Sequence, residues 1–159
     1  MLYFLLAAAL VALDEFVKLQ VMTHIPVGEH VPFLPYLVDL TYVRNTGAAF
    51  SIFSEHTWIL AGISLVMSVL LGWCLWKGIP FQKPLGRLTV TLLLAGAVGN
   101  LIDRAFRGFV VDMFNVLFMD FAVFNVADIC IVVGGFAAFA YYVLFASKLE
   151  ELHETDHNG

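Results

Sequence analysis

One stretch, from Trp58 to Trp76, limits what this chain can fold into more than any other. Seventeen residues lie between the two tryptophans, and their only polar side chains are two serines, a cysteine and the indole of Trp73. As a helix rising 1.5 Å per residue the stretch is about 27 Å long, close to the thickness of a bilayer's hydrocarbon core. A tryptophan at each end is typical of the two membrane interfaces. The stretch therefore predicts a transmembrane helix.

The rest of the chain has the same character. Of its 159 residues, 61% are hydrophobic and 13% are charged, and the mean hydropathy is +0.89, whereas about 25% of residues are charged in soluble proteins. We predict an all-α membrane protein with four transmembrane helices in a single domain, residues 1–159. The predicted spans are residues 2–22, 57–76, 85–103 and 126–147, and an acidic tail at 148–159 is expected to be cytoplasmic and disordered.

The first apolar run, residues 2–13, is short enough to be the hydrophobic region of a signal peptide. It lacks a basic start and a small-residue cleavage site. Apolar residues also resume after Asp14 and Glu15 and continue to Met22. The interpretation we favour is one helix of about 20 residues with charges near its far end.

Lysines and arginines predict the orientation. The connection between the second and third spans contains Lys77, Lys83 and Arg87 and no acid, which is typical of a cytoplasmic loop. Over the whole chain the basic residues divide equally between the two sides, so this short loop decides the prediction. Both termini are then cytoplasmic, and the charges within the spans collect toward the outer surface.

The outer segments predict a small β structure. Residues 38–53 combine a run of strand formers, an Asn-Thr-Gly turn and a second apolar run, the pattern of a hairpin at the membrane surface. Prolines at positions 26, 32 and 35 exclude a long helix before it. Residues 109–125 contain two short extended stretches around Met119 and Asp120, with Asp120 in a solvated turn. Because isolated hairpins are marginally stable, we expect these pieces to pair with one another.

Polar residues recur at helical spacing near the end of the third span. Gly96, Asn100 and either Asp103 or Arg104 follow one another at intervals of three or four residues and so share one helical face. The glycine in this stripe permits a close approach by another helix. We therefore expect a polar contact with a neighbouring span at this depth.

Two further acids stand close to this stripe. Asp128 shares a helical face with Asn125 at the start of the fourth span, and Asp112 follows an apolar run that has just left the third span. If the two converge, carboxyl groups a few ångströms apart do not both ionise easily, so one keeps its proton. Such a pair can activate a water with one carboxylate and polarise a scissile carbonyl with the other carboxyl.

A structural role is the alternative for each of these charges. Asp103 can pair with the adjacent Arg104, and Asp14 stands four residues before Lys18, the order that favours a helical ion pair. Acids within or against spans more often mark function. Spacing alone leaves both interpretations open.

Five motifs, in order along the chain, resemble those of the bacterial lipoprotein signal peptidases, the signal peptidase II family of membrane aspartic proteases. They are an aspartate and a lysine four residues apart late in the first span, NTGAAFS at 45–51, GNLIDR at 99–104, VVD at 110–112 and FNVAD at 124–128. The resemblance implies a four-helix membrane bundle with a small extracytoplasmic β-cradle, in the bacterial cell membrane, with its active site at the outer leaflet.

The resemblance also implies the reaction. Members of this family cleave the signal peptide of diacylglyceryl-modified prolipoproteins just before the lipidated cysteine, use no metal or cofactor, and are inhibited by the cyclic peptide globomycin. The catalytic residues implied are Asp112 and Asp128. The supporting residues implied are Asp14, Lys18, Asn45, Gly96, Asn100, Asp103, Arg104, Asn125 and Ala127. Two positions depart from the common pattern: Glu15 stands where many members have Gln, and Val17 where many have a hydroxyl residue.

Other kinds of protein carry acids within spans. A proton-coupled transporter should place acids through the thickness of the bilayer, whereas here they gather on one side, and a structural membrane subunit would tolerate neutralisation of Asp112.

Residues 153–157, HETDH, match the HExxH pattern of zinc proteases, but that chemistry needs an ordered helix and a third ligand. We expect no metal and no nucleic-acid partner, and a monomer in the lipid membrane.

Overall fold

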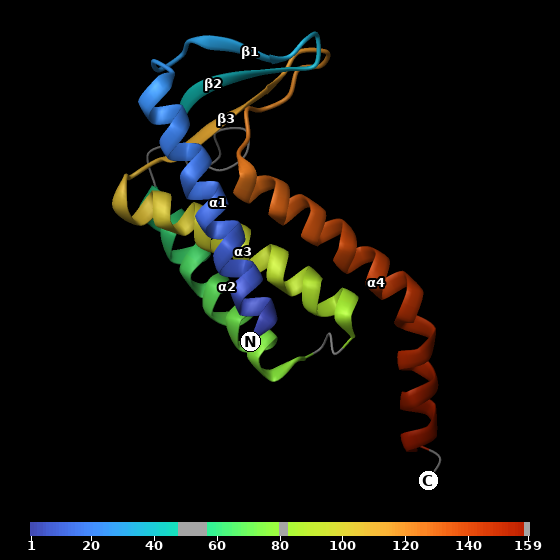
Figure 1. Cartoon of the computed structure of the whole chain (residues 1–159). Helices are drawn as coiled ribbons and strands as arrows, with labels where there is room; N and C mark the ends of the chain where they lie inside the picture. The colour runs from blue at the N-terminus through green and yellow to red at the C-terminus, as the bar shows by residue number, and fades with distance from the viewer. Residues whose placement is uncertain (48–56, 80–82, 158–159) are drawn as a thin grey trace.

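The structure is a computed structural model that describes residues 1–47, 57–79 and 83–157. This part of the chain forms four helices and one small sheet (Figure 1). The helices are α1 Leu2–His24, α2 Thr57–Lys77, α3 Pro84–Phe106 and α4 Val126–His157. The strands β1 His30–Leu34, β2 Val38–Asn45 and β3 Val110–Val116 form an antiparallel sheet in the order β1-β2-β3.

Three of the described helices are long and apolar enough to cross a membrane: α2, α3 and residues Val126–Phe145 of α4. Only 11% of the apolar window of α2 is buried inside the molecule, so its leucines and valines face outward in most directions. A surface of this kind is stable against lipid and not against water. The fourth predicted span, α1, has 23 residues and carries Asp14, Glu15 and Lys18 in its second half.

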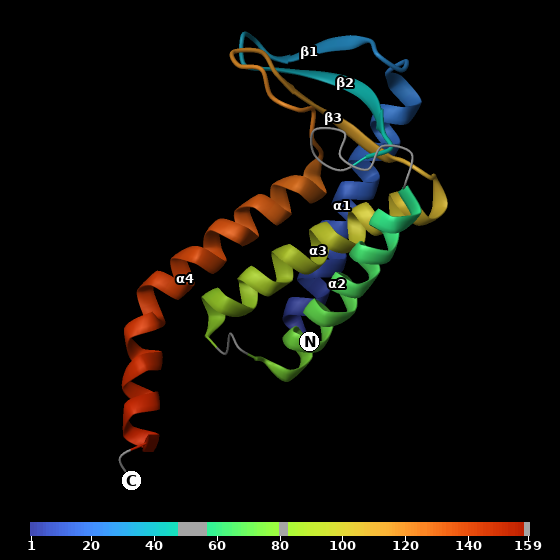
Figure 2. The same cartoon turned by 180° about the vertical axis from the view of Figure 1, so that it is seen from behind.

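Helix α3 lies at the centre of the helical part, with half of its apolar window buried. Near its N-terminal end Val90, Leu94 and Ala95 pack against Ala7 of α1 and Leu75 of α2. Helix α4 packs along the other side of α3 and then leans away from the bundle (Figures 1 and 2). The N-terminus, the C-terminal ends of α4 and α2, and the N-terminal end of α3 lie at the end opposite the sheet (Figure 1).

The sheet covers the other end of the bundle, where α1 ends. Val21 and Ile25 pack there with Tyr42 of β2 and with Val111 and Met113 of β3. Strand β3 pairs with β2 from Val38↔Val116 to Asn45↔Val110. The strand that leaves α3 is therefore held over the end of α1 by its own buried residues.

The hairpin differs from the prediction. Strand β2 forms a hairpin with β1, which precedes it in the chain. The turn between the two strands has Pro35 followed by Tyr36 at φ 64°, and proline followed by a residue of positive φ is the order of a type II turn. Pro32 is tolerated because β1 is an edge strand, and the outer side of an edge strand has no neighbouring strand to which a backbone N–H would donate. The predicted second arm, residues 49–53, lies outside the described residues.

The remaining outer segment matches the prediction in part. The first of its two extended stretches is β3, and the second contributes only an isolated bridge between Phe124 and Phe114. Asp120 lies between them and is exposed. The bridge brings the chain back beside β3 immediately before α4 begins.

The disordered acidic tail was a wrong prediction. Helix α4 continues without interruption to His157 and is 32 residues long. A helix that already exists grows by adding one hydrogen bond per residue and needs no new nucleus. The Lys-Leu-Glu-Glu-Leu run at 148–152 consists of good helix formers, which explains why acidic composition did not end the helix.

Candidate active site

Strand β3 brings Asp112 to the site because alternate residues of a strand face opposite sides. Its neighbours Val111 and Met113 are fully buried against α1. Asp112 faces the other way, beside Val43 of β2, and lines a cavity between the sheet and the helices. Although it borders a cavity, its relative exposure is only 2%.

Asp128 reaches the same cavity from the first turn of α4. The N–H of Asp128 donates to the side-chain oxygen of Asn125 at 2.8 Å, and the N–H of Asn125 donates to Asp128 Oδ2 at 3.2 Å. This reciprocal pair is a capping box, with Asn125 as the cap and Asp128 three residues on. The sequence Asn-Val-Ala-Asp thus begins the helix and at the same time fixes the side chain of Asp128.

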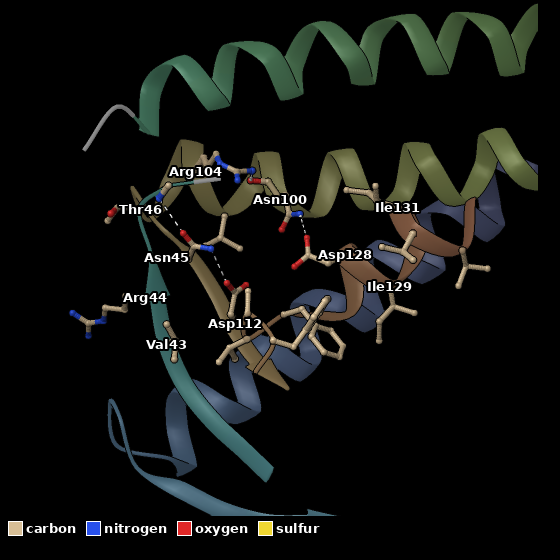
Figure 3. A pocket seen from close by; sticks show the side chains of 18 residues that line it. Val43, Arg44, Asn45, Thr46, Asn100, Arg104, Asp112, Asp128, Ile129 and Ile131 are labelled. Atoms are coloured by element: carbon tan, nitrogen blue, oxygen red, sulfur yellow. Dashed lines mark hydrogen bonds between the residues drawn. The ribbon is translucent and has the colours of Figure 1, made fainter. Parts of the chain in front are cut away.

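Amide groups connect the two aspartates. Asn125 Nδ2 donates to Asp112 Oδ1 at 2.7 Å and to Asn100 Oδ1 at 3.2 Å, and Asn100 Nδ2 donates to Asp128 Oδ1 at 2.8 Å. On the sheet side Asn45 Nδ2 donates to Asp112 Oδ2 at 2.9 Å. Figure 3 shows the carboxyl group of Asp112 beside the amide of Asn45 and that of Asp128 beside the amide of Asn100.

Backbone donors decide which way the two amides beside Asp112 point. The N–H of Gly47 donates to Asn45 Oδ1 at 2.9 Å, and the N–H of Asp128 donates to Asn125 Oδ1. Each amide therefore has its oxygen occupied and its NH₂ group turned toward Asp112. Asp112 receives one donor on each carboxyl oxygen.

The cavity has a volume of about 640 Å³. Its polar end contains Asp112, Asp128 and Arg104, and Arg104 Nε is buried there without a hydrogen-bond partner among the described residues. Its other wall is apolar, and residues of α4 that include Ile129 and Val132 line it. A long apolar wall beside two acids suits a ligand with a hydrophobic body and one polar, reactive bond.

Burial dominates the electrostatics of Asp112. Desolvation raises the pKa of its carboxyl group to about 6, helped by the nearby charge of Asp128 and opposed by the hydrogen bonds from Asn45 and Asn125. An acid with such a pKa can hold a proton under conditions in which an ordinary aspartate has lost it. Asp112 is therefore suited to the role of a proton donor.

A buried ion cluster lies behind the two aspartates. Lys18 Nζ lies 2.7 Å from Asp14 Oδ2 and 2.7 Å from Asp103 Oδ2, and all three side chains are almost completely buried. Asp14 Oδ1 accepts the N–H of Ala127 at 2.9 Å, and Asp103 Oδ2 accepts the N–H of Val111 at 3.1 Å. The predicted Asp14–Lys18 pair is confirmed, as part of a larger cluster.

Two glycines let α3 approach its neighbours. A Cβ on Gly96 would lie 2.4 Å from the carbonyl oxygen of Ala127 and 2.5 Å from Ile131 Cγ1, and one on Gly99 would lie 2.5 Å from Asp14 Oδ2. Only residues without a side chain permit these contacts. Gly96 was among the predicted supporting residues and Gly99, the first residue of GNLIDR, was not, although its spacing of three residues from Gly96 indicates a related helical face.

The structural alternative for Asp103 holds with other partners than the adjacent Arg104. Asp103 faces α1, where it pairs with Lys18 and with Arg107, whereas Arg104 faces the cavity together with Asn100. Successive residues of a helix point about 100° apart, so neighbours in sequence do not face one another. The stripe therefore divides into two faces, one toward the cavity and one toward the ion cluster.

Arg107 is a member of the cluster that the sequence analysis missed. It pairs with Asp103 four residues earlier and, at 2.8 Å, with Glu15 of α1. The departure at Glu15 thus has a charge partner in this chain. The other departure, Val17, packs with the apolar residues at the end of α1.

In the described part of the chain, no group of three or more His, Cys, Asp or Glu side chains is arranged to hold a metal ion. The HETDH run at 153–157 lies in the last turns of α4, so its backbone is helical. The side chains of these residues lie outside the described part of the structure. The run is far along α4 from the cavity, which lies at the N-terminal end of the same helix.

Fold and site together define a membrane protein with a pair of carboxyl groups in a cavity where a helical bundle meets a small sheet. The family described as Signal peptidase (SPase) II matches residues 6–145. The chain is 45% identical over 127 residues to a lipoprotein signal peptidase of Streptococcus pneumoniae, covering 79% of this chain and 81% of that one. It is 39% identical over 150 residues to that of Enterococcus faecalis, covering 94% and 92%.

Solved structures agree with these relatives. A bacterial membrane enzyme with 27% identity superposes with a TM-score of 0.84 over 92% of this chain and 90% of its own. A second, 28% identical, gives a TM-score of 0.78 over 87% and 90%. The chain belongs to the signal peptidase II family, and it is a protease of lipoprotein signal peptides.

Proposed function

We propose that Asp112 and Asp128 are the catalytic pair of a membrane aspartic endopeptidase, and that the bond cleaved lies just before the diacylglyceryl-modified cysteine of a prolipoprotein. The observation that carries this proposal is the shared cavity, in which both carboxyl groups face one space and are joined by two asparagines. Single-domain architecture over residues 1–159 belongs to the same proposal.

The mechanism assigns one role to each acid. Asp128 takes a proton from a water between the two groups, and the resulting hydroxide attacks the scissile carbonyl carbon while Asp112 gives its proton to the carbonyl oxygen. The carbon–nitrogen bond then breaks as the leaving amine receives the proton held by Asp128, and a hydroxyl of the tetrahedral intermediate returns a proton to Asp112, which leaves a carboxylic acid and the pair in its starting state. Two features support this division: burial raises the pKa of Asp112 to about 6, and the first turn of a helix stabilises a negative charge.

The cavity's shape supports the substrate class. Its apolar wall along α4 suits the hydrophobic helix of a signal peptide and the acyl chains of a modified cysteine, with the scissile bond at the polar end. The free Arg104 Nε supplies a donor for a substrate carbonyl. Cyclic peptides of the globomycin type would compete for the same space.

We further propose that all four helices span the bacterial cell membrane, as a monomer among lipids, with both termini cytoplasmic. The charges of α1 lie toward the sheet end of the molecule, and the ends of α2 and α3 that flank the acid-free basic connection lie at the opposite end with the N-terminus and the C-terminal end of α4. Basic loops favour the cytoplasmic side. The cavity would then open at the outer leaflet, where water can reach it.

The test compares Asp112→Asn and Asp128→Asn with Asp120→Asn, a matched change at an exposed position outside the cavity. Cleavage of a diacylated prolipoprotein peptide is measured in detergent, with thermal unfolding to verify folding. We expect each cavity variant to lose activity by at least about 10³-fold and the control to keep it. Near wild-type turnover in either folded cavity variant would refute the assignment, and loss of wild-type activity on chelation would point to a metal instead.

A further inference from the structure

Lys18 makes no contact with the cavity, yet it is connected to the backbone next to both aspartates. We propose that Lys18 is a positioning residue that sets the separation of Asp112 and Asp128. It would do so by holding together two carboxylates, each of which binds the backbone directly before one member of the pair. The inference rests on the proposed function of that pair.

The connection has two arms of similar construction. In one, Lys18 Nζ lies 2.7 Å from Asp103, which accepts the N–H of Val111 at 3.1 Å, one residue before Asp112. In the other, Lys18 Nζ lies 2.7 Å from Asp14, which accepts the N–H of Ala127 at 2.9 Å, one residue before Asp128. Each arm thus runs from one ammonium group to the backbone N–H of the residue that precedes one of the acids.

The two arms connect four different helices and strands. Val111 lies in β3 and Ala127 in α4, whereas the carboxylates come from α1 and α3. Lys18 is 0% exposed, and Asp14 and Asp103 are 1% and 0% exposed. Charges buried to this degree are strongly disfavoured unless they remain paired, so the ammonium and both carboxylates have little freedom to separate.

Charge balance alone does not explain Lys18. Asp103 has a second cation, Arg107, which lies four residues along α3. Asp14 has no other ion-pair partner than Lys18 within the described residues. Lys18 is therefore the group that joins the two arms. Its removal would break this connection even where Asp103 stays neutralised, and would leave the start of α4 and β3 linked by their direct contacts, such as the bond from Asn125 to Asp112.

The experiment uses the full chain in detergent and four variants. Lys18→Met removes the ammonium, Lys18→Arg keeps a cation with several N–H donors, and Lys77→Met is the same change at the exposed end of α2. The triple variant Asp14→Asn, Lys18→Met, Asp103→Asn removes all three charges and keeps an oxygen acceptor for each backbone N–H. This last variant keeps the test valid if Lys18→Met fails to fold because two acids are left unpaired.

Two readouts are measured for each variant: kcat and KM for a diacylated prolipoprotein peptide, and hydrogen exchange of peptides that contain Val111 or Ala127. We expect the triple variant to fold, to lose kcat by about a hundredfold with KM within about threefold, and to exchange faster in both peptides. Lys18→Arg should recover at least about a tenth of wild-type kcat, and Lys77→Met should match the wild type in both readouts.

Wild-type kcat in the triple variant would overturn the proposal, since charge neutrality would then be all that Lys18 supplies. The proposal would also be overturned if the triple variant lost kcat and substrate affinity equally and showed no change in hydrogen exchange. If the wild-type protein itself fails to cleave the peptide, the proposed function is refuted separately. Hydrogen exchange then tests the role of Lys18 independently of activity. Faster exchange in only one of the two peptides would show that Lys18 does not hold both arms.

Discussion

Asn125 binds Asp112 with one end of its amide and the start of α4 with the other. Its Nδ2 donates to Asp112 Oδ1 at 2.7 Å, while its Oδ1 accepts the N–H of Asp128 at 2.8 Å. The same side chain therefore orients one acid and caps the helix that carries the other. The two roles can be separated by substitution.

Asn125→Ser and Asn125→Ala should differ in stability and agree in activity. Serine is a good helix cap but is too short to reach Asp112, whereas alanine neither caps nor donates. We expect both variants to lose kcat by about tenfold or more, and the alanine variant to be about 1 kcal/mol less stable than the serine variant. Thermal unfolding in detergent and peptide cleavage measure the two effects, and full activity in the serine variant would show that the bond to Asp112 is dispensable.

The pH dependence should report the proton on Asp112. Because burial raises its pKa to about 6, its proton is lost as the pH rises through that value, and kcat/KM should fall there. The hydrogen bond from Asn45 stabilises the carboxylate and so lowers the pKa. Asn45→Ala should therefore move the falling limb to higher pH. A pH profile of both proteins checks this, and a limb that stays in place or moves to lower pH would contradict it.

Gly96→Ala and Gly72→Ala should have opposite effects on stability. A Cβ at position 96 would lie 2.4 Å from the backbone oxygen of Ala127, so α3 and α4 must separate, whereas a Cβ at position 72 has nothing within 4 Å. We expect a loss of about 1–3 kcal/mol for the first and a gain of up to about 1 kcal/mol for the second. Thermal unfolding measures both. Equal stability would mean that the contact at Gly96 can relax without strain.

Apolar composition was enough to predict three helices that are long and apolar enough to cross a membrane. Helical spacing was enough to predict the polar contact between the third span and its neighbour, which Asn100 and Asp128 make. The third span was predicted at 85–103 and the helix runs from Pro84 to Phe106, because a helix does not end where the apolar run ends. That short extension explains why Arg107 was missed: it stands four residues after Asp103, beyond the predicted end of the span.

Two other differences have physical causes that local sequence does not show. The rotation of α3 about its own axis decides whether Asp103 or Arg104 faces the cavity, and packing of Gly99 against Asp14 of α1 sets that rotation. Strand β1 depends on lying at the edge of the sheet, where Pro32 does no harm. Both are properties of the assembled fold, and no window of sequence contains them.

The capping box at the start of α4 also limits how the chain can change in length. Asp128 belongs both to the cap and to the cavity, so a single residue inserted or deleted between Asn125 and Asp128 would break the cap and turn the carboxyl group away by about 100°. The exposed segment at 117–120 has no such tie to the acids. We expect insertions and deletions to be tolerated in the segment at 117–120 and not between Asn125 and Asp128.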